Sequence, residues 1–440
     1  MITVKRFFWG GAVFLLMLVQ ISSPQSAEIA FVPAAQQGVS VARLQRLTAL
    51  AERYVADERV AGMHLMVNRG GQLVFDEVVG QRSIEDERPL AKEDLYRIYS
   101  MTKPITAVAI MQLYESGHFR LSDPITRWLP ELKDLKVLNS DGSLTPANAP
   151  ITMLQLLTHT AGFSYGFNPA DPVDQAYRAA DLWGSVDLEA LVLKVATLPL
   201  KFQPGAQWHY SIAVDLTGLI VQRISGRRFD VYLREAIFEP LGMTDTFFEV
   251  PEAKRARLLT NHFWDPRSNE LKVIRSTAPG LGLDSADDAM SNFKKVSLFS
   301  GGGGLVSTAR DYMRFAEMLR AGGVLEGERI LGTKTLKFMT KNHLPDRIES
   351  GGSGEDPVSA RFRGLGFGLG FGVITDSVGS QSLSSQGSYF WGGAAGTIFW
   401  VDPEEDLVGL GMIQLMGSPW PFREELRIAV YQTLTDSYEP

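Results

Sequence analysis

Cysteine is absent from the 440 residues of the chain. This absence excludes thiol catalysis, disulfide bonds and cysteine-ligated metal, and it leaves the redox compartment open. Basic residues are in the minority, with 43 lysines and arginines against 50 acidic residues and a formal net charge of −7. We find no cluster of lysines or arginines that offsets this balance, so the composition argues against nucleic acid as a partner.

Histidine is scarce and scattered. The six histidines form neither an H-E-x-x-H motif nor a pair at i, i+4, so we expect no metal centre. Glycine alternates with larger residues between Gly364 and Gly372, but this stretch lacks the strand-loop-helix setting of a dinucleotide site. We interpret it as a close-packed strand, and we expect no cofactor.

A long apolar run occurs only at the start of the chain. Two basic residues precede an apolar run over residues 7–21, and small polar residues follow as far as Ala27. This order is typical of a secretory signal peptide, although Gln25 is a poor −3 residue for cleavage after Ala27, which leaves an uncleaved anchor as the alternative. We expect residues 1–27 to be a signal peptide or N-terminal anchor of a periplasmic or secreted protein, in contact with a membrane only through this leader.

The remaining sequence has helical texture in its middle and extended texture towards its ends. Apolar residues recur at helical spacing over 40–57, and two extended runs flank a turn at 68–71. Residues 104–240 are mostly apolar at helical spacing, with proline and glycine between the segments. Residues 364–416 indicate further strands, and 422–434 indicate a closing helix.

These patterns predict an α+β fold in which both ends of the chain build one antiparallel sheet, flanked by terminal helices. A mostly helical region is inserted between the second and third strands of this sheet. We expect the sheet domain to comprise residues 38–103 and 290–440, and the helical domain to comprise residues 104–289. An active site would lie in the cleft between them.

Ser100 and Lys103 stand three residues apart in the stretch YSMTKP. If Ser100 opens a helix, both side chains lie on one face, with the amine beside the hydroxyl. The ordinary alternative is a capping serine with a solvated lysine, and the same spacing recurs at Ser291 and Lys294. That second pair lies beside two aspartates, where a lysine stays hydrated, whereas the apolar residues after Lys103 predict that its side chain is buried.

A serine hydroxyl is a weak nucleophile and needs a neighbouring base, for which a buried amine at the start of a helix is suited. The competing serine is Ser164, in the G-x-S-x-G pattern GFSYG. This pattern follows a helical segment instead of a strand, and we interpret it as accidental. His159 is the histidine nearest in character to a functional one, although a backbone hydrogen bond at a helix end is its commoner role.

Three motifs, in this order along the chain, resemble those of the serine beta-lactamase-like superfamily. S-M-T-K at 100–103 resembles its S-x-x-K motif, Y-S-I at 210–212 its tyrosine motif, and W-G-G at 391–393 the strand motif that is K-T-G in many relatives. Segments 151–163 and 301–319 resemble recurrent segments of the class C-like branch. Within the superfamily, the motifs are most similar to those of family VIII carboxylesterases.

The resemblance implies a role for each motif. Ser100 would be acylated, Lys103 would hold or accept its proton, and Tyr210 would relay protons among the serine, the leaving group and the deacylating water. A phenol becomes a useful base when a neighbouring ammonium stabilises its anion, so Tyr210 would depend on Lys103. The backbone N–H groups of Ser100 and Ala394 would form the oxyanion hole.

Two departures from the family pattern bear on the substrate. Ile212 replaces the amide-binding asparagine of penicillin-recognising relatives, and Trp391 replaces the K-T-G lysine that attracts the carboxylate of the antibiotic. An apolar ring suits a neutral ester better than an anionic lactam. We therefore expect a serine carboxylesterase acting on neutral, short-chain esters, with Trp391, Gly392, Gly393 and Ile212 in contact with the substrate.

Three alternatives stay open. The first is a class C-like beta-lactamase or D-Ala-D-Ala carboxypeptidase, the second is an acyltransferase using the same site, and the third is a catalytically idle binding protein that keeps the fold. Asp215 and His159 are further candidates for supporting the site from behind. The sequence does not indicate an oligomeric state.

Overall fold

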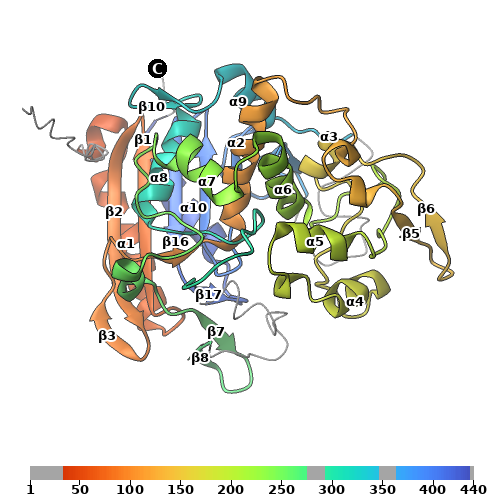
Figure 1. Cartoon of the computed structure of the whole chain (residues 1–440). Helices are drawn as coiled ribbons and strands as arrows, with labels where there is room; N and C mark the ends of the chain where they lie inside the picture. Colours follow the sequence, from red (N-terminus) through yellow and green to blue (C-terminus); the bar gives the residue numbers. More distant parts are fainter. Residues whose placement is uncertain (1–32, 275–292, 346–362, 437–440) are drawn as a thin grey trace, which may run out of the picture.

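The computed structural model describes residues 33–274, 293–345 and 363–436 (Figure 1). The predicted leader at 1–27 and Ser291 of the second serine-lysine pair lie outside these ranges. Within the described ranges, no helix combines the length and the apolar character that crossing a membrane requires.

One eight-stranded sheet is built from both ends of the chain. Its strands, in spatial order, are β12 (Leu365–Phe367), β13 (Gly372–Ile374), β14 (Tyr389–Gly392), β15 (Ile398–Asp402), β16 (Leu407–Met412), β1 (Gly62–Arg69), β2 (Gln72–Ser83) and β3 (Asp86–Pro89). All neighbouring strands pair antiparallel. The predicted α+β fold with an antiparallel sheet is therefore confirmed.

The predicted turn at 68–71 joins β1 to β2. Gly70 and Gly71 both have positive φ, 62° and 76°, which glycine adopts without the penalty that a Cβ would bring. On its other side β1 pairs with β16, with Met66 opposite Leu410. The first strand is thus the seam where the two ends of the chain meet.

Helices cover both faces of the sheet (Figure 1). α1 (Val41–Ala56) and α10 (Phe422–Tyr431) pack with Met63, Leu65 and Val67 of β1 on one face. α8 (Ala309–Arg320) belongs to the larger apolar cluster on the other face, which Met66 joins. Because side chains alternate along a strand, β1 supplies apolar residues to both layers and is buried on both sides.

The middle of the chain supplies most of the remaining helices. They are α2 (Thr102–Glu115), α3 (Met153–Leu157), α4 (Pro172–Ala179), α5 (Leu188–Val195), α6 (Ala213–Ser225) and α7 (Phe229–Leu233), with α9 (Thr333–Met339) following later. Short strands pair outside the main sheet: β4 (Tyr96–Arg97) with β9 (Val306–Ser307), β5 (Lys136–Leu138) with β6 (Leu144–Pro146), β7 (His262–Asp265) with β8 (Glu270–Val273), and β10 (Val324–Leu325) with β11 (Glu328–Arg329).

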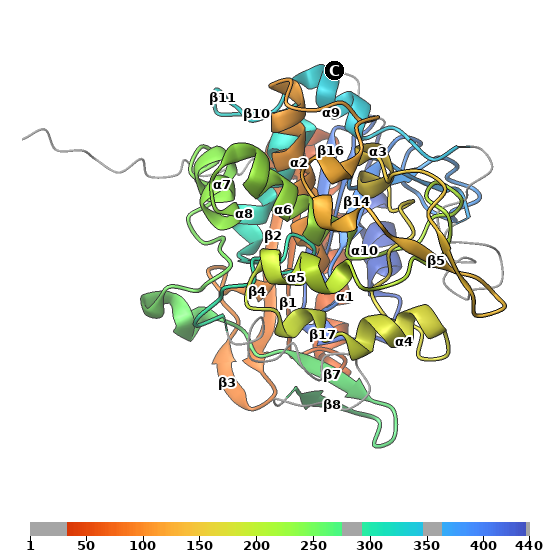
Figure 2. The same ribbon diagram turned by 45° about the vertical axis from the view of Figure 1, so that its right-hand side comes forward.

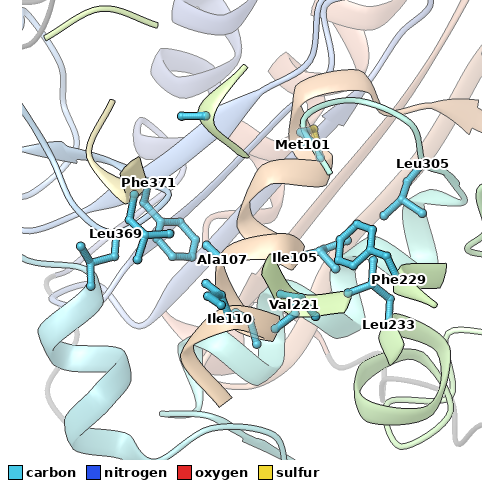
Figure 3. Packing of buried hydrophobic residues seen from close by; sticks show 14 of the residues in the cluster. Met101, Ile105, Ala107, Ile110, Val221, Phe229, Leu233, Leu305, Leu369 and Phe371 are labelled. Carbon is cyan, nitrogen blue, oxygen red and sulfur yellow. The ribbon is translucent and has the colours of Figure 1, made fainter. Parts of the chain in front are cut away.

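α2 lies at the centre of the molecule, between the sheet and the other middle helices (Figure 2). Every residue from Thr102 to Met111 is buried, and α6 is its main helical neighbour. Figure 3 shows apolar side chains around it, including Phe371 on one side and Phe229 on another. A helix that is buried all round is fixed by packing on every side, so the residues at its N-terminus are held in a defined place.

Three local features differ from the expectations. Ser100 lies in a 3-10 turn, Tyr99–Met101, that leads into α2, and not in the α-helix itself. The alternating glycines at 364–372 form the hairpin of β12 and β13 instead of one strand. β7 pairs in parallel with β17 (Leu415–Met416), so the middle segment contributes a strand that joins the C-terminal one. The domain boundaries at 103 and 289 stay a prediction.

A buried arginine ties the two ends of the chain to the sheet. The side chain of Arg69, at the end of β1, is 1% exposed. Its Nη1 donates to the carbonyl oxygens of Gln37 at 3.0 Å and Gly38 at 2.9 Å, and its Nη2 donates to Glu405 Oε2 at 2.9 Å and to the Asp436 carbonyl at 3.0 Å. These bonds hold the terminal segments together at the end of β1.

We predict that Arg69→Met lowers the free energy of unfolding by about 3 kcal/mol, because it leaves the mostly buried carboxylate of Glu405 without its cation. Urea unfolding followed by circular dichroism measures the change. The matched control is Arg53→Met, which breaks an exposed ion pair with Glu425 between α1 and α10 and should cost less than about 1 kcal/mol. Equal losses in the two variants would contradict this account.

Candidate active site

The turn that carries Ser100 is held from several sides. Ile98 donates its N–H to the Leu305 carbonyl at 3.1 Å, and Tyr312 donates its hydroxyl to the Met101 carbonyl at 2.9 Å. Tyr99, immediately before the serine, has a φ of 43°, a strained value for a residue with a side chain. Such strain persists only where surrounding contacts impose it. It fixes the direction in which the half-buried Ser100 side chain projects from the backbone.

Lys103 is buried beneath Ser100. Its side chain is 1% exposed, and its Nζ donates to Ser100 Oγ at 3.3 Å and to the Gly302 carbonyl oxygen at 2.6 Å. The same nitrogen lies 4.5 Å from the centre of the Tyr210 ring and 5.0 Å from that of Tyr165. Two tyrosine rings and a carbonyl thus stabilise an ammonium that burial would otherwise penalise.

Tyr210 comes from the loop before α6. Its ring packs against His159, Tyr165 and Trp391, with ring centres 4.9, 5.2 and 5.5 Å apart. Its hydroxyl oxygen is buried and has no hydrogen-bond partner within the described part of the protein. A buried phenol without a partner is unusual, and it is available to a reacting group.

A second buried charge lies behind Lys103. The carboxylate of Asp215, on α6, accepts hydrogen bonds from Ser300 Oγ at 2.5 Å, the Gly302 N–H at 3.0 Å and the Tyr165 hydroxyl at 3.2 Å. Burial raises its pKa, and the positive charge of Lys103 acts in the opposite direction. Gly302 therefore joins the two charges: its N–H binds the carboxylate and its carbonyl binds the ammonium.

Only glycine fits at position 302. A Cβ there would lie 2.3 Å from Asp215 Oδ2 and 2.6 Å from the Tyr165 hydroxyl oxygen. Sequence reasoning missed Gly302, Tyr165 and Ser300 as members of the site. Four consecutive glycines, Gly301 to Gly304, were the available signal, because backbone atoms that approach a buried side chain this closely require glycine.

His159 supports the tyrosine and does not approach the serine as a base. Its Nδ1 accepts the Ser211 N–H at 3.3 Å, and its ring lies between Tyr210 and Phe367. Burial, with a contribution from the charge of Lys103, holds the pKa of His159 well below its usual value, so the ring stays neutral at pH 7. Its φ of 57° shows that the chain turns sharply at this point.

The W-G-G motif ends β14 beside the nucleophile turn. Gly392 closes the strand, and residues 393–396 form a tight turn in which the Gly396 N–H donates to the Gly393 carbonyl at 3.0 Å. A Cβ on Gly393 would lie 2.4 Å from the Ile98 carbonyl oxygen, so this turn packs directly against the backbone two residues before Ser100. Ala394, the second residue of the turn, is exposed there.

The two glycines make room for protein atoms. Gly393 accommodates the Ile98 carbonyl, and a Cβ on Gly392 would lie 2.7 Å from Cζ of Arg423 on α10. Both glycines thus meet a packing requirement of the protein itself, and their expected contact with substrate stays a prediction. The half-buried ring of Trp391 packs against Tyr210 and Phe367, and its contact with substrate stays a prediction.

Ile212 is buried in the core at the start of α6. It occupies the N-cap position of α6, and its side chain has no exposed surface within the large apolar cluster. The expected substrate contact through Ile212 is therefore not present, because the residue at this position turns its side chain into the core.

Ser164, the competing serine, is fully buried in the loop after α3. Its hydroxyl donates a short hydrogen bond to the carboxylate of Asp174, which is paired with Lys201 at 2.9 Å. The pattern lies at no strand-to-helix turn, as expected of an accidental match. The hydroxyl also lies 3.4 Å from His209 Nε2 and accepts the Gly166 N–H at 3.2 Å, and the side chain has no exposed surface, which indicates a structural role.

Among the described residues, no group of three or more histidine, aspartate and glutamate side chains is arranged to hold a metal ion. The polar groups that converge near Ser100 are a lysine, two tyrosines and backbone amides and carbonyls. These groups suit proton transfer and charge stabilisation at a serine.

Comparison with known proteins agrees with this arrangement. The family model named Beta-lactamase matches residues 47–432. Protein Rv1367c of Mycobacterium tuberculosis is 36% identical over 363 residues, which cover 81% of this chain and 86% of the relative. Esterase EstB of Burkholderia gladioli is 28% identical over 403 residues, covering 88% of this chain and 94% of the relative.

A solved structure has the same fold. It is that of EstCE1, described as a hydrolase with promiscuous acyltransferase activity, and it superposes with a TM-score of 0.72 at 23% identity, over 89% of this chain and 99% of EstCE1. The match to the family model over most of the chain, together with these relatives, confirms the resemblance that the three motifs indicated: the chain belongs to the beta-lactamase family.

Proposed function

We propose that this protein is a serine carboxylesterase that hydrolyses neutral, short-chain esters through an acyl-enzyme on Ser100. The chain is a serine hydrolase of the beta-lactamase family, with esterases among its relatives. The observation that carries the proposal is the buried Lys103, whose Nζ lies 3.3 Å from Ser100 Oγ and 4.5 Å from the centre of the Tyr210 ring.

Acylation begins with attack of Ser100 Oγ on the ester carbonyl carbon. The hydroxyl proton passes to the Tyr210 phenolate or to the Lys103 amine, and the carbonyl oxygen becomes an oxyanion bound by the N–H groups of Ser100 and Ala394. Collapse of this intermediate breaks the bond to the alcohol oxygen, which takes the proton and leaves. Deacylation repeats the sequence with water as the nucleophile and returns Ser100 to its hydroxyl form.

Lys103 and Tyr210 act as one unit in this scheme. An ammonium at Lys103 has three N–H donors, of which one reaches Ser100 and one the Gly302 carbonyl, while the tyrosine ring packs beside it. Its positive charge stabilises a phenolate at Tyr210. Because the described residues offer the Tyr210 hydroxyl oxygen no hydrogen-bond partner, this oxygen is available to the serine or to water.

The surroundings of the site favour neutral esters. Trp391 presents an apolar ring beside Tyr210, and Phe167, 69% exposed, stacks on Tyr165 with ring centres 5.0 Å apart and an interplanar angle of 20°. An aromatic wall of this kind contacts apolar groups and gives no cation for a carboxylate. EstB and the lovastatin esterase of Penicillium rubens, 30% identical over 366 residues, bear the word esterase in their names.

Acyl transfer to an alcohol is the second candidate function. EstCE1 and the monacolin J acid methylbutanoyltransferase of Aspergillus terreus, the latter 27% identical over 387 residues, carry acyltransferase activity in their descriptions. The same acyl-enzyme serves both reactions, and an alcohol replaces water in the second step. Product analysis in the presence of added alcohol separates them, since transfer gives a new ester.

The substrate is a small ester, and we propose that the enzyme meets it outside the cytoplasm. The support for this location is the basic, apolar and small-polar order of residues 1–27. Cell fractionation with antibody detection tests it, and a protein found only in the cytoplasmic fraction would contradict it.

We predict that Ser100→Ala, Lys103→Ala and Tyr210→Phe each lower kcat/KM for p-nitrophenyl butyrate by about a thousandfold or more. Each substitution removes the nucleophile or a group that takes part in proton transfer. The matched control is Ser164→Ala, which should keep its activity. A wild-type enzyme that hydrolyses a chromogenic cephalosporin faster than the ester would instead favour the beta-lactamase alternative.

Asp215→Asn should lower kcat about tenfold with little change in KM. The amide nitrogen of the asparagine would face at least one of the hydrogen-bond donors Ser300, Gly302 and Tyr165, and the resulting shift would move Gly302 away from Lys103. Asp174→Asn, at a buried carboxylate paired with Lys201, is the control and should keep its kcat. Loss of activity in both variants would indicate a general effect of buried charge.

The same substitution has a second consequence. Burial raises the pKa of Asp215 in the folded state above its usual 3.8. The protonated carboxyl therefore contributes to stability fully below pH 3.8, and this contribution is lost as the pH rises through the higher pKa of the folded state. In Asp215→Asn the free energy of unfolding should therefore fall less with rising pH than in the wild type. Urea titrations between pH 4 and 8 measure the two slopes, and identical slopes would contradict the assigned charge.

Phe167→Ala should raise KM for p-nitrophenyl butyrate about two- to tenfold and leave KM for methyl butyrate unchanged, because only the aryl group stacks on the ring. Steady-state kinetics with both esters measure this. Leu144→Ala, at an exposed leucine of β6, removes a similar apolar group elsewhere and serves as the control. An equal effect on both esters would show that Phe167 does not contact the leaving group.

A further inference from the structure

Arg423 contacts the peptide group on which the expected oxyanion hole depends. This arginine lies in the first turn of α10, on the C-terminal helix, and its Nη2 donates a short hydrogen bond to the Gly393 carbonyl oxygen. That carbonyl and the N–H of Ala394 belong to one planar peptide unit. The guanidinium therefore acts at one end of the dipole whose other end is the Ala394 N–H.

The packing of the motif shows that the guanidinium has a prepared place. A Cβ on Gly392 would lie 2.7 Å from Arg423 Cζ and 2.9 Å from both its Nη2 and the Thr397 carbonyl oxygen, so the guanidinium lies directly against the backbone at position 392. On the other side, Gly393 is pressed against the Ile98 carbonyl. The peptide between Gly393 and Ala394 is thus held between a helix from the C-terminus and the segment that leads to Ser100.

A cation at a carbonyl oxygen strengthens the N–H of the same peptide. It stabilises the resonance form with negative charge on oxygen, so more positive charge resides on the N–H, and hydrogen bonds at the two ends reinforce each other. The Gly396 N–H donates to the same carbonyl at 3.0 Å and acts in the same direction. Donors that are fixed and polarised before the reaction stabilise an oxyanion most effectively.

We propose that Arg423 is a positioning residue of the oxyanion hole: it orients the peptide between Gly393 and Ala394 and polarises its N–H towards the developing oxyanion. This inference rests on the proposed function, because the Ala394 N–H has this role only if Ser100 is acylated. It gives α10, which packs in a different apolar cluster from the serine turn, an electrostatic part in the reaction.

The test compares Arg423→Met, Arg423→Gln and Arg423→Lys with the wild type. We expect kcat for p-nitrophenyl butyrate to fall about tenfold in Arg423→Met, less in Arg423→Gln and least in Arg423→Lys, which keeps a cation, with KM nearly constant. Arg427→Gln is the matched control. It lies one turn further along α10, where its guanidinium stacks on Phe390 at 4.4 Å, and it should keep its kcat.

Inhibition by a trifluoromethyl ketone distinguishes positioning from simple structural support. Ser100 Oγ attacks the ketone carbonyl carbon and gives a tetrahedral adduct with an oxyanion. The Ki of the ketone should therefore rise by the same factor as kcat falls, while KM for the ester stays level. Gly392→Ala, which displaces the guanidinium without removing it, should reproduce both changes if Arg423→Met folds poorly. An unchanged Ki in soluble, folded Arg423→Met would overturn the inference.

Failure of the proposed function gives a different result. In that case the wild type would neither hydrolyse the ester nor be labelled at Ser100 by a fluorophosphonate, and the role of Arg423 would fall with it. A wild type that does both, with Arg423 variants that match it in kcat and Ki, overturns the role of Arg423 alone.

Discussion

A single buried ammonium is the constraint on which the site depends. Lys103 has almost no exposed surface, so its charge must be compensated inside the protein. The Gly302 carbonyl and the rings of Tyr165 and Tyr210 contact the ammonium, and the Asp215 carboxylate is linked to it through Gly302. These groups come from three separate segments of the chain, because Tyr210 and Asp215 both belong to the start of α6 and the loop before it. Keeping the charge inside therefore requires the segments that carry Tyr165, Tyr210 and Gly302 to meet at one point.

The fold supplies this meeting point through two layers of support. α2 is packed on every side, which fixes the serine turn and the lysine, and the sheet brings β14 beside that turn. The sheet itself is formed from both ends of the chain, with Arg69 joining the terminal segments to it. The C-terminal half of the chain contributes both β14 and α10. The stability of its attachment to the sheet therefore also determines how exactly β14 is placed beside the serine turn.

Much of this arrangement could be predicted from the sequence. Hydrophobic periodicity indicated the terminal helices, the hairpin and the helical middle, because these depend on local spacing. The three motifs indicated the family and placed Ser100, Lys103 and Tyr210 in one site, although their catalytic roles stay proposals. The spacing S-x-x-K was informative because a helical turn converts it directly into proximity.

The parts that sequence reasoning missed depend on long-range packing. The contact of Gly302 with Lys103 joins residues about 200 positions apart, and that of Arg423 with Gly393 depends on how α10 lies on the sheet. Ile212 was misplaced because its side-chain direction is set by its position at the start of α6, where it turns into the core. Gly392 and Gly393 were expected to contact substrate, and the structure shows that protein atoms also lie close against both of them.

The most direct test is to locate and time the covalent adduct. Wild type and Lys103→Met are exposed to a fluorophosphonate, and peptide mass spectrometry follows the modified serine. We expect the wild type to be labelled at Ser100 and the variant to be labelled there at least about a hundredfold more slowly, because Lys103 together with Tyr210 activates the hydroxyl. Labelling at Ser164, or equal rates at Ser100 in both proteins, would contradict the account.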